Sequence, residues 1–104
     1  MTLKWIQNPD EFREVINRDE PTLIYFTDTR KGPPGPEFAA LSTDKHPAAQ
    51  KETFFVDLGA EYIPGVPSQA FVTILYRNGQ ELDTAAGGDM SKFFELSERV
   101  AAGN

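Results

Sequence analysis

The segment from Thr22 to Thr27 constrains the fold of this chain more than any other feature. It reads Thr-Leu-Ile-Tyr-Phe-Thr, a continuous apolar run rather than an alternation of apolar and polar residues. Such a run is typical of a strand in a sheet that is covered on both faces. A second apolar segment, residues 53–58, contains Phe54 beside Phe55, so one aromatic ring would point to each face of the sheet. We therefore expect a sheet that lies between two layers of helices.

Three positions have the features of a helix start. Asn8 is a favourable N-cap, and Pro9 fits the first helical position, where no backbone N–H is required. Pro36 can occupy the first turn of a second helix, which we expect to end near residue 43. Asp89 can cap a last helix with an apolar face.

Strands are also expected over residues 3–7, 70–77 and 80–85, and Asn78-Gly79 predicts a tight hairpin between the last two. Helices that separate the earlier strands imply right-handed crossovers and parallel pairing. The hairpin adds an antiparallel pair. The sequence thus predicts one α/β domain that spans the 104 residues, with a mixed central β-sheet flanked by helices on both faces.

The chain contains no cysteine. This absence excludes disulfides, thiolate catalysis, thiolate metal sites and iron–sulfur clusters within these residues. His46 is the only histidine, and one histidine near one aspartate is not a metal site, since typical sites need three or four ligands. We therefore expect no metal and no cofactor, and an exposed position for His46. Trp5, the only tryptophan, is expected to pack an edge strand against the first helix.

Three segments together resemble the thioredoxin family over nearly the whole chain. Residues 22–33 match its strand and Gly-Pro active-site loop, residues 55–57 match the Val-Asp end of its third strand, and residues 72–80 match its apolar strand followed by Asn-Gly. The resemblance implies a thioredoxin-like fold.

The functional positions of that family differ in this chain. The resemblance places the nucleophilic cysteine on Lys31, the resolving cysteine on Pro34, and the preceding tryptophan on Arg30. The family's buried aspartate corresponds to Tyr25. Thiol–disulfide exchange needs a thiolate, so the chain is expected not to be a thiol oxidoreductase, and other enzyme activity is not expected.

The family's cis-proline, which faces the active site and binds substrate backbone, has two candidate positions. Counting back from Asn78-Gly79 without a gap places it on Phe71. Matching the pattern Gly-Ile-Pro-Thr instead points to Pro67, within Gly65-Val-Pro-Ser. The sequence leaves this choice open.

The leading hypothesis is a redox-inactive thioredoxin-like module that binds another protein or peptide, as an adaptor, assembly chaperone or complex subunit. Rigid prolines lower the entropy cost of ordering a recognition loop, and an apolar patch beside that loop would mark an interface. We expect Tyr62 and Ile63 to be exposed in such a patch. The candidate partner-binding residues are Arg30, Lys31, Gly32, Pro33, Pro34, Tyr62, Ile63 and Phe71.

Three alternatives stay open. One is a glutathione-transferase-like remnant that binds a small molecule or anion near Arg30 and Lys31. A second is similar to the cysteine-less thioredoxin-fold chaperones of hydrogenase maturation, whose basic target signals would suit an acidic chain. A third is an oligomer in which the apolar patch pairs with itself.

Net charge limits the classes of partner. The chain carries a charge of −6, with 16 acidic and 10 basic residues, and its longest basic cluster is Arg30-Lys31. Nucleic-acid binding needs several converging cations, and an acidic surface disfavours anionic membranes. We therefore expect no nucleic-acid or membrane partner. The first residues contain no apolar run of the kind found in signal peptides, so a cytoplasmic location is the expectation.

Overall fold

The computed structural model describes residues 2–42, 46–47, 52–60 and 63–103. These residues form a five-stranded sheet and three helices. The elements are β1 (Thr2–Trp5), α1 (Pro9–Ile16), β2 (Thr22–Thr27), α2 (Pro36–Ser42), β3 (Glu52–Asp57), β4 (Val72–Arg77), β5 (Gln80–Ala85) and α3 (Met90–Ala102).

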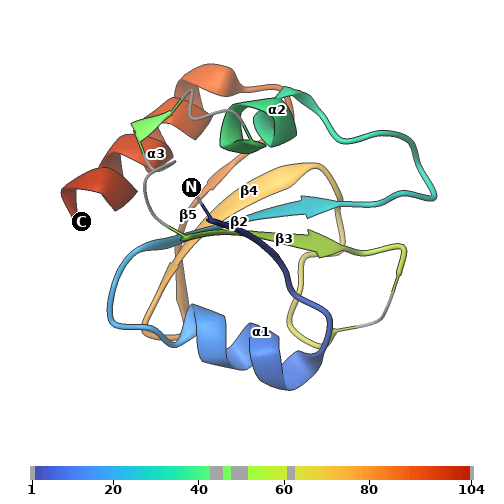
Figure 1. Cartoon of the computed structure of the whole chain (residues 1–104), viewed down its shortest axis with the longest axis horizontal. Coiled ribbons are helices and arrows are strands. Elements are labelled where there is room, and N and C mark those ends of the chain that lie inside the picture. Colours follow the sequence, from blue (N-terminus) through green and yellow to red (C-terminus); the bar gives the residue numbers. More distant parts are fainter. Residues whose placement is uncertain (1, 43–45, 48–51, 61–62, 104) are drawn as a thin grey trace.

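The strands lie in the order β1-β3-β2-β4-β5. The pairs β1–β3 and β3–β2 are parallel, whereas β2–β4 and β4–β5 are antiparallel. Helix α1 covers one face of the sheet, and α2 and α3 cover the other (Figure 1). This arrangement confirms the predicted mixed sheet with helices on both faces.

Two hydrophobic cores form because successive residues of a strand point to opposite faces of the sheet. In β2, Ile24 and Phe26 belong to the core under α1, and Leu23 and Tyr25 belong to the core under α2 and α3. All four are at most 2% exposed. The continuous apolar run of this strand is therefore explained by its burial on both sides.

The β4–β5 hairpin is fastened to the end of α1. Its turn has a positive φ at Asn78 (53°) and at Gly79 (81°), as a two-residue hairpin loop of the favoured type requires. The two turn amides donate hydrogen bonds to backbone carbonyls at the end of α1 and just after it, from Gly79 to Ile16 at 2.8 Å and from Asn78 to Arg18 at 3.0 Å. The last two strands thereby hold the first helix in place.

Two expectations about single aromatic residues were wrong. Trp5 does not pack on α1; its ring centroid lies 5.2 Å from that of Phe55 and 6.2 Å from that of Phe38, on the α2 side of the sheet. The cause is register, because Trp5 pairs with Phe55 and neighbours in register point to the same face. His46 is only 5% exposed, and its ring lies 5.6 Å from that of Phe93.

The structure also bears on membrane insertion. Within the described residues, no helix has both the length and the apolar character needed to span a membrane.

Helix α1 begins with the predicted cap, which can be tested directly. The Asn8 side chain accepts a hydrogen bond from the Glu11 amide at 2.8 Å. Replacing Asn8 with alanine leaves that amide without its partner and should lower the free energy of unfolding by about 1 kcal/mol. Asn8→Asp keeps an acceptor and should retain most of the stability. Urea denaturation of both variants checks this; an equal loss in the two would contradict the cap.

Candidate functional site

The candidate site lies at the carboxyl ends of the parallel strands β2 and β3. Loops that follow such strands form the usual ligand-binding crevice of α/β sheets. The loop from residue 28 to residue 35 leaves β2 here, and α2 begins only at Pro36. This start agrees with the expectation that Pro36 occupies the first turn of the second helix.

An ion pair between the buried Asp28 carboxylate and the exposed Arg30 guanidinium holds the start of this loop. The Asp28 carboxylate is only 3% exposed and accepts hydrogen bonds from Arg30 Nε at 3.0 Å and Nη2 at 2.9 Å. It also accepts one from the Arg30 backbone amide at 3.0 Å. The hydrogen bonds from the Arg30 side chain lower the pKa of Asp28 below its ordinary value, although burial acts in the opposite direction. Asp28 is therefore charged near neutral pH, and its charge is compensated locally.

A second carboxylate, from the end of β3, holds the same loop. Asp57 accepts hydrogen bonds from the Thr29 amide at 3.1 Å, the Thr29 hydroxyl at 2.9 Å and the Gly59 amide at 2.9 Å. Burial alone would raise the pKa of Asp57, but these three hydrogen bonds outweigh it and keep that pKa below its ordinary value. Two carboxylates from neighbouring strands therefore fix the backbone of residues 29–30.

The second half of the loop borders an open groove of about 370 Å³, which we call the loop groove. Its opposite wall consists of Phe71 and the glycine pair between β5 and α3. The lining residues are Tyr25, Lys31, Gly32, Pro33, Gly35, Glu37, Phe71, Gly87 and Gly88.

Tyr25 and Glu37 provide buried polar groups in the lining of the loop groove. The Tyr25 hydroxyl accepts a hydrogen bond from the Gly35 amide at 3.0 Å, and Glu37 Oε2 accepts one from the Gly88 amide at 2.8 Å. Burial raises the pKa of Tyr25, and the nearby Glu37 charge adds to this effect although the Gly35 bond opposes it. The phenol is therefore neutral at physiological pH. Tyr25 thus contacts the loop that forms one wall of the groove, and Glu37 contacts the glycine pair of the opposite wall.

Phe71 occupies the position immediately before β4 and faces the loop across this groove. Its φ is 63°, and its amide donates to the Phe26 carbonyl at 2.6 Å. Pro67 instead lines a neighbouring hollow. The geometry therefore favours Phe71 over Pro67 as the counterpart of the family's cis-proline. No peptide bond in the described part of the chain is cis.

The neighbouring hollow encloses about 570 Å³ and lies on the other side of Lys31, which lines both spaces. Arg30 and Ile63 line this second hollow and not the loop groove. Ile63 is only 2% exposed and belongs to the core under α1, so its expected exposure was wrong. The predicted binding residue Tyr62 lies outside the described residues.

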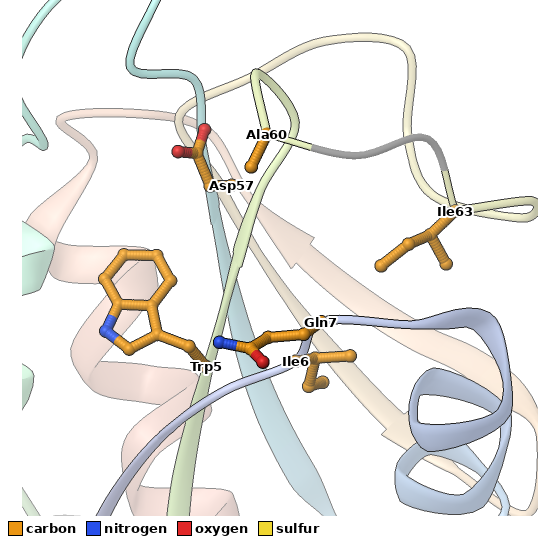
Figure 2. Close-up of a pocket in the computed structure, with 6 residues that line it drawn as sticks. All are labelled: Trp5, Ile6, Gln7, Asp57, Ala60 and Ile63. Atoms are coloured by element: carbon orange, nitrogen blue, oxygen red, sulfur yellow. The ribbon is translucent and has the colours of Figure 1, made fainter.

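A third hollow of about 370 Å³ lies at the ends of β1 and β3. Figure 2 shows the Trp5 indole and the Gln7 amide beside each other, the Asp57 carboxylate near them, and Ile63 on the opposite side. Trp5 is 40% exposed, which is unusual for so large an apolar side chain. Its hollow and that of Arg30 share Ala60 and Ile63.

The sequence interpretation thus brought together part of the site and missed the rest. Lys31, Gly32, Pro33 and Phe71 do line one groove, whereas Pro34 is absent from its lining. Glu37 was missed, because a glutamate in the first turn of a helix is ordinarily a solvated residue. The ion pair after β2 could have been predicted from the sequence, because Asp28 and Arg30 carry opposite charges and are close together in the chain.

The expected absence of a metal site rested on composition. Among the described residues, no group of three or more aspartate, glutamate or histidine side chains is placed to hold a metal ion.

Comparison with known proteins gives one clear relative in sequence and several in structure. No protein-family model matches the chain. It is 34% identical over 94 residues to a thioredoxin of Malassezia sympodialis, covering 84% of this chain and 88% of that protein. The crystal structure of Malassezia sympodialis thioredoxin superposes with a TM-score of 0.74 at 26% identity, covering 96% of this chain and 91% of that one.

A thioredoxin of Plasmodium falciparum supports the same fold. It gives a TM-score of 0.65 at 21% identity and covers 92% of this chain and 97% of its own. The predicted thioredoxin-like fold is confirmed.

The role of Asp57 in fixing the loop predicts a pH dependence. Because its folded-state pKa is lowered, its contribution is fully present above the unfolded value of about 3.9 and is lost as the pH falls through the lower folded value. Asp57→Asn should therefore be less stable than the unmodified chain at neutral pH, and the difference should shrink below about pH 4. Denaturation at a series of pH values measures this. Asp19→Asn, at a carboxylate that is 82% exposed, is the matched control, and a difference that grows in acid would contradict the assignment.

Proposed function

This chain belongs to the thioredoxin family, and from that premise we propose that it is a redox-inactive binding module. In this proposal the loop groove holds a segment of another protein, and the chain acts as an adaptor, assembly chaperone or complex subunit. The observation that carries it is an open groove at the family's active-site position that is lined by Lys31 and no thiol.

The chemistry of the family cannot come from these residues. Exchange requires a thiolate that attacks a disulfide sulfur, and the chain has no cysteine. Lys31 and Pro34 stand at the two cysteine positions implied by the resemblance. A proline has neither a side-chain nucleophile nor a backbone donor. Pro34 therefore supplies neither a nucleophile nor an amide N–H at the second cysteine position.

The composition of the loop groove supports binding of an extended chain. Four of its nine lining residues are glycines, which leave backbone groups accessible because no Cβ covers them. Backbone groups and aromatic side chains, here those of Phe71 and Tyr25, are the features by which proteins hold extended peptides. The lining residues of the loop groove do not indicate any particular chemical reaction.

The fixed geometry of the loop also supports a binding role. Asp28 and Asp57 together hold residues 29–30 by five hydrogen bonds to carboxylate oxygens, three from the Arg30 and Thr29 side chains and two from their amides. Asp57 accepts one further hydrogen bond, from the Gly59 amide. A loop held in one conformation loses less entropy when a partner binds.

The anion-binding alternative has weaker support. The Arg30 guanidinium already forms two hydrogen bonds with the buried Asp28 carboxylate, so its charge is compensated. Pro33 and Pro34 have no amide donors for an anion. The hydrogenase-maturation type of chaperone is a specific version of the present proposal, supported by the acidic net charge.

The binding role predicts the result of affinity capture from the source cells. Lys31→Glu combined with Pro33→Asp changes the shape and the charge of the exposed rim of the loop groove and should remove a stoichiometric partner, because the complementarity of the contact is lost. Quantitative mass spectrometry measures the loss. Lys4→Glu, the same lysine-to-glutamate substitution at an exposed position of β1, is the control. Capture that is equal in all three proteins would contradict this surface.

The two hypotheses differ in calorimetry with small anions. Because Arg30 is paired, we expect no saturable heat when millimolar glutathione or phosphate is titrated into the protein. Heat that saturates, and that Arg30→Ala abolishes, would favour the anion-binding alternative over the binding module.

A further inference from the structure

We infer that the loop groove contains a subsite for a lysine side chain of the bound segment, with the Glu37 carboxylate as its acceptor. This inference rests on the proposed function, since it names the chemistry of what the same groove holds. It starts from the one charged side chain that is buried in the lining of the groove. Glu37 is 1% exposed.

Only one of the two Glu37 oxygens has a hydrogen-bond donor. Oε2 accepts from the Gly88 amide at 2.8 Å, whereas Oε1 is buried and has no partner among the described residues. A buried carboxylate oxygen without a donor is costly, because the group has lost water and gained nothing in exchange. A donor from a ligand would remove this cost, so Oε1 favours binding of a group that carries N–H.

Gly35 determines how much room there is beside Oε1. A Cβ on Gly35 would lie 2.8 Å from Glu37 Oε1 and 3.2 Å from the Tyr25 hydroxyl. The glycine thus leaves a narrow space next to two oxygen acceptors. The Tyr25 hydroxyl accepts one bond from the Gly35 amide and, as a hydroxyl, has a second lone pair to offer.

A primary ammonium matches this space better than the other donors of a polypeptide. It is compact, it is positively charged, and it carries three donors that rotate freely, whereas a guanidinium is planar and broad. Its charge would compensate that of Glu37, and the net charge of −6 attracts basic segments. Lys31 is the other charged residue of the lining, and it is exposed, so water screens its repulsion.

The test uses short blocked alanine peptides that differ only at a central lysine, norleucine or arginine. Norleucine keeps an unbranched apolar chain without the charge. Binding is followed through the amide resonances of Gly35 and Gly88, which donate to Tyr25 and Glu37. We expect the lysine peptide to bind about tenfold more tightly than the norleucine peptide, the gain of one charge-assisted hydrogen bond.

Two variants separate charge from space. Glu37→Gln keeps the shape and an acceptor for Gly88 but removes the charge, and Gly35→Ala keeps the charge but fills the space beside Oε1. Each should reduce the preference for lysine to about onefold. Glu98→Gln, the same charge change on an exposed part of α3, should preserve it. If Gly35→Ala does not fold, Glu37→Gln and Glu98→Gln still decide the question.

The outcomes distinguish this inference from the proposed function. Equal binding of the lysine and norleucine peptides would overturn the subsite while the groove would still be a peptide-binding site. Binding of arginine as tightly as lysine would overturn the choice of a primary ammonium. No response to any peptide would overturn the subsite, and the capture experiment would then judge the proposed function separately.

Discussion

The burial of β2 on both faces is the constraint on which the rest of the structure depends. Its backbone pairs with β3 on one edge and β4 on the other, and its side chains alternate between two cores. Because β2 is held between two strands and two cores, its end at Thr27 is fixed, and so is the place of Asp28, the next residue. The loop, the groove and the start of α2 all take their places from that point. Both layers of helices depend on the same strand, so the site cannot shift without disturbing both cores.

Around this strand the carboxylates of the protein fall into two kinds. Asp28 and Asp57 are surrounded by donors and serve to fix the loop. Glu37 is buried, but one of its oxygens is left without a donor. Satisfied carboxylates are part of the framework, and an unsatisfied one beside a groove is a reason for a ligand to bind. That contrast distinguishes the structural polar groups of this site from the group that we assign to recognition.

The sequence predicted those features that depend on neighbours along the chain. The Asn8 cap, the start of α2 at Pro36 and the hairpin at Asn78-Gly79 are each set by a few adjacent residues. Features that depend on strand register or distant contacts were not predictable. Trp5 points to the same face of the sheet as Phe55 because the two residues are paired in register. Glu37 accepts a hydrogen bond from Gly88, which is 51 residues further along the chain. A glutamate is assumed to face water unless its distant partner is known.

The carboxylate hydrogen bonds that fix the loop have a consequence for how the protein responds to its surroundings. In a thiol-bearing protein, two cysteines in such a loop would respond to the supply of electrons. Here the loop from residue 28 to residue 35 contains no sulfur, and it is held by Asp28 and Asp57. Thiol oxidants and reductants therefore have no target in this loop, whereas protonation of Asp28 or Asp57 would weaken the hydrogen bonds that hold it. Because the pKa values of both carboxylates lie below their ordinary range, the loop keeps these hydrogen bonds at neutral pH.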